Sequence, residues 1–339
     1  MFRKLVLPVV LLAILAACGG TSAASPTTVT VYSADGLADW YQARFEAFTK
    51  QTGIKVQLVE AGSGEVVSRL QKEKSNPQAD VVVTLPPFIQ KAAAEGLLTP
   101  YQVAGRDQVK GLKDAEGNYV AVVENYLSFI VNPARAGQVP KSFDDLLDPR
   151  YKGKIQYSTP GQAGDGTAVL LLLQLQRGKQ GALDYLSKLE ANNVGPSAST
   201  GKLQPKVSKG EIWVANGDVQ MNLASIANDK SAFRLFFPAQ PDGKRSTLSI
   251  PYTMGLGADA PNSEGGRKLM DYLLSNEAQQ TVSAEAFGLP ARADVTPSDA
   301  NFTAVREATK GVEVIQADWT KVLADLDADV EAYNKAVAG

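Results

Sequence analysis

The strongest constraint on the fold is a pattern that repeats three times in the first third of the chain. Each copy has a run of strand-forming residues, then a polar turn, then apolar residues at helical spacing. The strand-like runs are Val29–Tyr32, Ile54–Val59 and Ala79–Val83. This alternation predicts an α/β fold in which a mostly parallel sheet is flanked by helices. Ligands of such sheets bind beyond the carboxyl ends of the strands, where these polar turns lie.

The N-terminus has the pattern of a secretory signal rather than that of a folded element. Arg3 and Lys4 precede an apolar run that is too short to span a bilayer and that ends in Leu-Ala-Ala-Cys at Cys18. This ending resembles a bacterial lipoprotein lipobox. We therefore expect residues 1–17 to be a lipoprotein signal peptide and Cys18 to carry a lipid, with an ordinary thiol as the alternative. Residues 18–28 would form a flexible tether outside the cytoplasm.

Composition narrows the classes of function. A chain of 339 residues that is 44% hydrophobic suits about two globular domains. The formal net charge is −2 and no dense basic cluster occurs, which argues against nucleic-acid binding. Histidine is absent, and with it the commonest general base and a common metal ligand. We therefore expect no enzyme activity, no cofactor and no metal site, and the single cysteine excludes a disulfide within the chain.

A glycine-rich turn, Ser158–Thr167, runs directly into the leucine-rich run Ala168–Gln174. The apolar run predicts a buried helix, which places the glycines at its N-terminus. The first N–H groups of a helix lack intrahelical partners and the helix dipole adds positive charge, so an anion binds well there. We expect Gly164, Gly166 and Thr167 to donate to an oxyanion. A surface loop with a capping residue is the alternative.

Two other turns have the same character. Ser33 follows the first predicted strand, and Ser63 and Gly64 follow the second, so each lies where a strand passes into a helix. Because the carboxyl ends of parallel strands meet at one edge of a sheet, we expect these residues and the glycine-rich turn to form one oxyanion site. Helix capping is the alternative for either serine.

Two later segments resemble the type II extracellular solute-binding proteins of ABC importers. One is Asp145–Ile155, which matches the family pattern D-L-L-D-P-x-[WY]-K-G-K-I. The other is Tyr272–Gln279, followed by Gly288–Arg292. The resemblance implies a binding protein rather than an enzyme. It also implies that the protein acts as a monomer and delivers a small solute to an ABC permease in the inner membrane.

The same resemblance implies a two-lobed periplasmic-binding-protein type II fold, with a mostly parallel sheet flanked by helices in each lobe. Residues 29–124 and 252–339 would form lobe 1, and residues 125–251 would form lobe 2. Two crossover strands are expected near Val122–Tyr126 and Ser249–Met254. The lobes would close on a ligand between them by a hinge motion.

Within this family, Val31–Leu37 and Thr159–Ala168 are similar to the corresponding segments of the 2-aminoethylphosphonate-binding proteins. That ligand carries a phosphonate at one end and an ammonium at the other, so it suits neutral donors opposite a carboxylate. Asp35, Glu124 and Asp165 are the candidates for the ammonium. Helix capping is the alternative for the two aspartates, and exposure to solvent or an interlobe salt bridge is the alternative for Glu124.

Other segments have simpler interpretations. Tyr126, Asn222 and Tyr252 are candidates for lining the cleft, although an aromatic residue near a crossover more often packs than binds. The small polar stretch 197–202 is interpreted as a plain loop, with hydrogen-bond donors from the second lobe as the alternative. The segment Val312–Val337 has apolar residues at helical spacing and is interpreted as packing.

Several alternatives for the ligand stay open. Ferric-binding members of the family carry an adjacent pair of tyrosines where this chain has Leu223–Ala227, so the sequence argues against a ferric site. The same fold with a phosphate-like anion, a polyamine or a ferric complex remains the main alternative. A secreted phosphoesterase with an aspartate or serine nucleophile is more remote, because histidine and a cluster of metal ligands are both missing.

Overall fold

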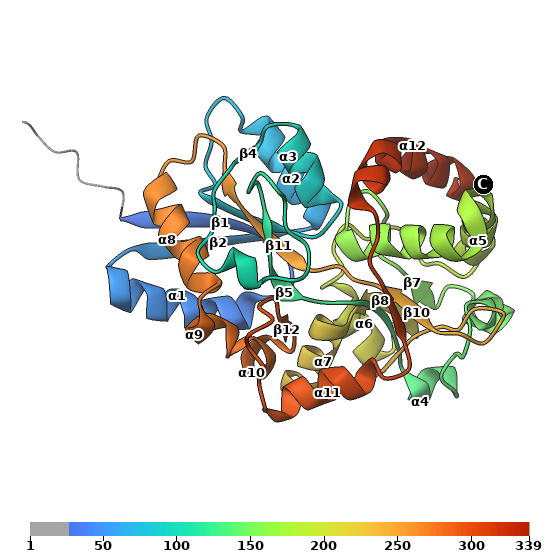
Figure 1. Cartoon of the computed structure of the whole chain (residues 1–339). Helices are drawn as coiled ribbons and strands as arrows, with labels where there is room; N and C mark the ends of the chain where they lie inside the picture. The colour runs from blue at the N-terminus through green and yellow to red at the C-terminus, as the bar shows by residue number, and fades with distance from the viewer. Residues whose placement is uncertain (1–26, 339) are drawn as a thin grey trace, which may run out of the picture.

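The computed structural model describes residues 27–338 and consists of two lobes, each with a β-sheet and helices packed on it (Figure 1). The described chain begins in one lobe and ends in the other. This two-lobed α/β arrangement confirms the predicted fold class. The predicted signal peptide and Cys18 lie outside the described residues.

Lobe 1 is built on a seven-stranded sheet. Its strands are β1 (Thr28–Ala34), β2 (Lys55–Ala61), β3 (Val81–Thr84), β4 (Leu98–Thr99), β5 (Val120–Glu124), β11 (Tyr252–Gly257) and β12 (Leu289–Pro290). The strands from the three repeats run parallel, with β1 between β2 and β3. β11 pairs antiparallel with β3, β4 and β5 and so continues the sheet. The repeated pattern therefore predicted the parallel half of this sheet correctly.

The helices of lobe 1 follow the strands as predicted. They are α1 (Ala38–Thr52), α2 (Ser63–Lys72), α3 (Phe88–Ala94), α8 (Ser263–Leu273), α9 (Asn276–Gln279) and α10 (Val282–Ala286), with a 3-10 turn η1 (Arg106–Gln108). Gly53 ends α1 in a left-handed conformation, φ 74°, and its N–H donates to Thr49 O at 2.8 Å. On the buried face of α1, Trp40, Tyr41 and Phe48 form part of the core.

Lobe 2 contains a four-stranded sheet in the order β7-β8-β6-β9. Its strands are β6 (Leu127–Val131), β7 (Ile155–Gln156), β8 (Val214–Asp218) and β9 (Arg234–Phe236). Its helices are α4 (Pro133–Ala136), α5 (Gly164–Glu190), α6 (Leu203–Lys209) and α7 (Val219–Asn228), with 3-10 turns η2 (Asp144–Leu147) and η3 (Pro149–Tyr151). The leucine-rich start of α5 is buried, as predicted, and the helix is kinked at Gly178.

Two strand connections join the lobes. The chain passes from β5 to β6 through Asn125 and Tyr126, and it returns from β10 (Ser246–Leu248) to β11. The two connections run antiparallel beside each other, because Tyr126 pairs with Ser249 and the Ile250 N–H donates to Asn125 O at 2.9 Å. A hinge made of two paired segments lets the lobes rotate while it restricts other motions.

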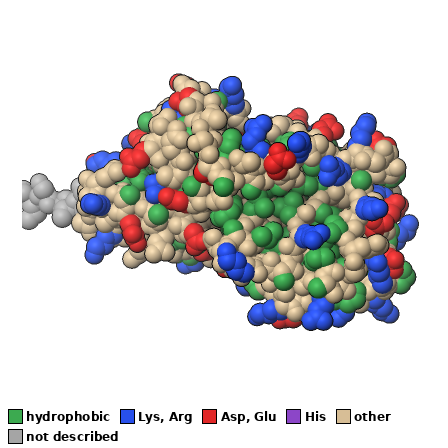
Figure 2. Space-filling view, turned by 90° about the horizontal axis from the view of Figure 1, so that it is seen from below, with side chains coloured by type: hydrophobic (Ala, Val, Ile, Leu, Met, Phe, Trp, Pro, Cys, Tyr) green, Lys and Arg blue, Asp and Glu red, His purple; other side chains and the backbone are tan. Residues whose placement is uncertain are grey.

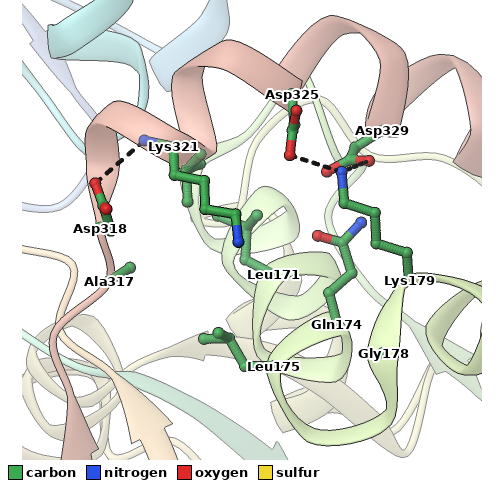
Figure 3. A pocket seen from close by; sticks show the side chains of 11 residues that line it. Leu171, Gln174, Leu175, Gly178, Lys179, Ala317, Asp318, Lys321, Asp325 and Asp329 are labelled. Atoms are coloured by element: carbon green, nitrogen blue, oxygen red, sulfur yellow. Dashed lines mark hydrogen bonds and ion pairs between the residues drawn. The ribbon is translucent and has the colours of Figure 1, made fainter.

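The C-terminal segment differs from its predicted place. Residues 252–339 were all expected in lobe 1, but β13 (Glu313–Ile315) pairs with β10, and α12 (Trp319–Val337) packs along α5. Lys179 of α5 forms ion pairs with Asp325 at 2.9 Å and Asp329 at 2.8 Å, at the side of a groove between the two helices (Figure 3). After α11 (Ala300–Ala308) the chain therefore crosses between the lobes a third time.

The surface shows no strong bias in charge on the face drawn in Figure 2. Basic and acidic side chains lie scattered over it, and hydrophobic side chains gather near its centre. Among residues 27–338, no helix is both long enough and apolar enough to cross a bilayer.

Candidate functional site

The lobes touch at the carboxyl end of β1, where a carboxylate of lobe 1 meets a loop of lobe 2. The Ser199 hydroxyl donates to Asp35 Oδ2 at 2.5 Å. Asp35 is half-buried, and Ser199 lies on the loop that leads into α6. The loop is itself tied to the glycine-rich turn, because Thr200 Oγ1 donates to Ser158 Oγ at 3.0 Å. The interpretation of 197–202 as a plain loop is therefore wrong: the loop carries an interlobe contact.

Two further carboxylates lie behind Asp35 and are fully buried. Asp218 is the N-cap of α7, and its Oδ1 accepts from the Met221 N–H at 2.6 Å. Asp165 lies in the first turn of α5, and its Oδ1 is buried without a hydrogen-bond partner among the described residues. An orphaned buried oxygen is costly, so this atom is a candidate contact for the polar group of a ligand.

Tyr252 links the backbone of Asp35 to the carboxylate of Asp218. Its hydroxyl donates to Asp35 O at 2.8 Å and lies 3.4 Å from Asp218 Oδ2 and 3.3 Å from Gln220 Oε1. The ring is buried at the start of β11, the strand that returns from lobe 2. Tyr252 therefore lies between the Asp35 backbone of lobe 1 and the Asp218 carboxylate of lobe 2, and its role in lining the cleft stays a prediction.

The electrostatics of this cluster favour a cation. Burial raises the pKa of Asp165 well above its ordinary range, and the neighbouring charges of Asp218 and Asp35 raise it further. Burial also raises the pKa of Asp218 to about 6, although hydrogen bonds from Met221, Asn125 and Tyr252 oppose the shift. None of the ion pairs formed within the described part of the chain includes Asp35, Asp165 or Asp218.

Neutral donors lie next to the carboxylates, where the first turns of α2 and α5 face each other across the lobes. Ser63 is the first residue of α2 and Gly164 the first of α5, and a Cβ added at Gly164 would lie 2.7 Å from Ser63 Oγ. The Gly64 N–H donates to Gln162 O at 2.9 Å across the same gap. Two helix N-termini that meet in this way create a region of positive potential without any formal cation.

Two of the predicted phosphonate donors, Ser33 and Thr167, have their hydroxyls engaged elsewhere. Ser33 Oγ bonds to Ala34 O at 2.9 Å and to Tyr41 OH at 3.2 Å inside lobe 1. Thr167 Oγ1 accepts from the Gly161 N–H and donates to Ala163 O, both at 2.9 Å, and so fixes the glycine-rich turn. Gly166 lies against the backbone of Ser158, where any Cβ would clash. These residues support the site through internal hydrogen bonds and packing rather than by direct contact with a ligand.

Glu124 lies at the hinge and not with the three aspartates. Its Oε1 is buried without a hydrogen-bond partner among residues 27–338, its Oε2 accepts from Ser249 Oγ at 3.5 Å, and Gly111 packs against the carboxylate. Burial raises the pKa of Glu124 to about 7. The expectation that Glu124 pairs with the ligand is not supported by these contacts, since they join it to Ser249 and Gly111 and not to the three aspartates.

The other two candidates for lining the cleft also lie elsewhere. Tyr126 packs beside Val219, Phe237 and Val305 below the hinge, and burial raises the pKa of its hydroxyl to about 12. Asn222 is buried within lobe 2, where its Nδ2 donates to Ser128 Oγ at 3.0 Å. Both side chains serve packing and internal hydrogen bonding.

Sequence reasoning missed Asp218 and undervalued Ser199. Asp218 was visible as a potential cap, because it stands directly before the apolar segment that forms α7. Nothing in the local sequence indicates that its second oxygen faces Tyr252, since that contact joins residues 34 positions apart. Within the described chain, no group of three His, Cys, Asp or Glu side chains is arranged to hold a metal ion.

Comparisons with known proteins agree with this architecture. The family model described as "Bacterial extracellular solute-binding protein" matches residues 76–319. A Salmonella typhimurium protein named "Putative 2-aminoethylphosphonate-binding periplasmic protein" is 52% identical over 314 residues, which cover 91% of this chain and 92% of the relative.

Solved structures show the same fold at low sequence identity. The periplasmic binding protein P5PA superposes with a TM-score of 0.81 at 22% identity, over 91% of this chain and 99% of that one. A periplasmic thiamin binding protein gives a TM-score of 0.79 at 21% identity, over 91% and 96%. Proteins of this kind bind solutes and are not enzymes. The chain belongs to the bacterial extracellular solute-binding proteins.

Proposed function

We propose that this protein captures 2-aminoethylphosphonate between its lobes and presents it to an ABC permease in the inner membrane. One observation carries the proposal: the carboxylates of Asp35, Asp165 and Asp218 lie close together at the contact between the lobes. In the described chain no basic side chain forms an ion pair with any of them. The relative that bears this ligand in its name supports the choice of solute. A plain phosphate or sulfate would be repelled by such carboxylates.

The two ends of the proposed ligand have matching partners close together. Asp165 follows Gly164 directly in the chain, so a carboxylate and the N-terminal donors of α5 are separated by a single residue step. The ammonium would pair with Asp35, Asp165 and Asp218. The phosphonate would accept from the Ser63 hydroxyl and from the backbone N–H at Gly164, whereas the Gly64 N–H is engaged with Gln162 O in the closed state.

Capture would work through closure of the hinge. The hydrogen bonds from Ser199 to Asp35 and from Gly64 to Gln162 cross between lobes, so they exist only while the lobes are together. A ligand that contacts both lobes binds the closed state better and shifts the population toward it. A lipid on Cys18 would keep the protein, as a monomer, at the outer face of the membrane that holds the permease.

The test is isothermal titration of the mature soluble chain, begun at Ser22, with 2-aminoethylphosphonate. Ethylphosphonate, inorganic phosphate and putrescine are titrated alongside. We expect one-to-one binding of the zwitterion, with a free energy of about −8 kcal/mol if the affinity is micromolar. Binding of phosphate, putrescine or a ferric complex in place of the zwitterion would overturn the ligand assignment and leave the fold unchanged.

A further inference from the structure

We propose that capture of the zwitterionic solute, through its ammonium, is coupled to the release of a proton from the Asp165–Asp218 pair. The inference rests on the proposed function, because it takes the ammonium as the incoming cation. It adds a regulation of the same site by pH.

The two buried aspartates differ in how well they are satisfied. Asp218 accepts from the Met221 N–H through one oxygen and lies near the Tyr252 hydroxyl through the other. Asp165 has a buried Oδ1 with no partner among the described residues. The Asp165 carboxyl is better accommodated when it carries a proton, because a neutral acid costs far less free energy to bury than a carboxylate.

The groups that face the pair supply no compensating charge. Asp35 adds a third carboxylate, and Glu60 on β2 lies near Asp35 and has its own pKa raised by burial. Tyr41 and Tyr252 are neutral hydroxyls whose pKa values burial raises above the ordinary value of 10.0. Asp39 of α1 and Lys202 of the loop before α6 are exposed.

The ammonium of the ligand replaces a proton on the Asp165–Asp218 pair, and both charge and protons are conserved in this exchange. In the ligand-free protein one proton resides on an oxygen of the pair, which titrates as a unit. Entry of the ammonium favours the ionised form of both carboxylates, so that O–H bond breaks and the proton passes to the solvent buffer. The ammonium keeps its own three protons and takes over the neutralising role. Affinity therefore rises with pH over the range in which the ligand-free pair still holds its proton.

The experiment measures protons directly. The mature chain is titrated with 2-aminoethylphosphonate near pH 7 in buffers of different ionisation enthalpy, and the slope of heat against that enthalpy gives the number of protons released. Phosphorus NMR of the free and bound ligand gives the change in phosphonate protonation, which is subtracted. We expect about one proton from the protein and an affinity that rises by up to about tenfold per pH unit.

Two variants separate this inference from a general effect of buried acids. Asp165→Asn should lower the protein's proton release to near zero, whereas the matched control Asp80→Asn should leave it unchanged. Asp80 is also a buried carboxylate with a pKa raised by burial, but it bonds to Thr30 and Asn262 inside lobe 1. Binding of the zwitterion by the unmodified chain without proton release, and with affinity independent of pH, would overturn the coupling while the proposed function stands. Absence of binding would overturn both.

Discussion

Lys91 of α3 and Asp327 of α12 form an ion pair of 2.8 Å that joins lobe 1 to the helix packed on lobe 2. Asp327 is 86% exposed, and solvent therefore screens the attraction. Pairs of this kind contribute about 0.2–1 kcal/mol. The contact therefore stabilises the closed state only weakly, at a position far from the hinge.

Asp327→Asn should accelerate ligand release by no more than about fivefold, which corresponds to the upper end of that range. The difference should shrink at high salt because the pair is screened. Stopped-flow measurement of the dissociation rate checks this at two ionic strengths. Asp325→Asn is the matched control, since Asp325 pairs with Lys179 within lobe 2; an equal effect of both variants would contradict an interlobe role.

Asp35→Asn should weaken 2-aminoethylphosphonate far more than methylphosphonate, because only the former carries an ammonium. Hydrogen bonds to charged groups contribute about 1.5–3 kcal/mol, so we expect a loss of roughly ten- to 150-fold. Parallel titrations of both ligands give the ratio. Equal losses for the two ligands would remove the ammonium role of Asp35 and point to its contact with Ser199 instead.

Gly164→Ala should obstruct closure without unfolding either lobe. The added methyl would lie 2.6 Å from Leu85 Cδ1 and 2.7 Å from Ser63 Oγ, and both of these residues belong to the opposite lobe. Overpacking costs about 1–3 kcal/mol, so affinity should fall at least about fivefold. Gly181→Ala, later in α5, is the control and should raise stability slightly at unchanged affinity. Titration with the ligand gives the affinity of both variants, and thermal melting gives their stability. Unchanged affinity of Gly164→Ala would count against the proposed site.

Glu124→Gln should make stability less dependent on pH. The carboxyl has a pKa of about 7 in the folded protein against an ordinary value of 4.5, so the unfolded chain ionises first as the pH rises. Burial of Glu124 therefore lowers the free energy of unfolding progressively between about pH 4.5 and about pH 7, and by a constant amount above that. The melting temperature of the variant should exceed that of the unmodified chain at about pH 8 and match it near pH 4. A difference that stays constant over this range would contradict the assignment.

The sequence predicted the parts of the fold that depend on local order. The repeats gave β1, β2 and β3 with their helices, because periodicity and turn residues act within a few positions of each other. The buried start of α5 follows from the same local signals. The nearness of Asp35 and Ser63 also follows from strand ends that share an edge, whereas Gly164 comes from the other lobe.

The errors concern contacts between distant residues. The Val312–Val337 segment is amphipathic, but nothing in its pattern indicates that α5 is its partner rather than a helix of lobe 1. Glu124 resembles Asp35 as an acidic residue after a strand, yet its strand leads into the hinge. Asp218 could be recognised as a cap only, since its second role depends on Tyr252 from the returning strand.

The third crossing of the chain places the two ends of its described part, residues 27–338, on different lobes. The described N-terminus enters β1 of lobe 1, whereas α12 ends against lobe 2 (Figure 1). Any opening of the cleft therefore changes the separation of the two ends. A fluorescent donor and acceptor fused to the termini would report solute capture as a change in energy transfer, so the native topology already has the layout of a genetically encoded sensor.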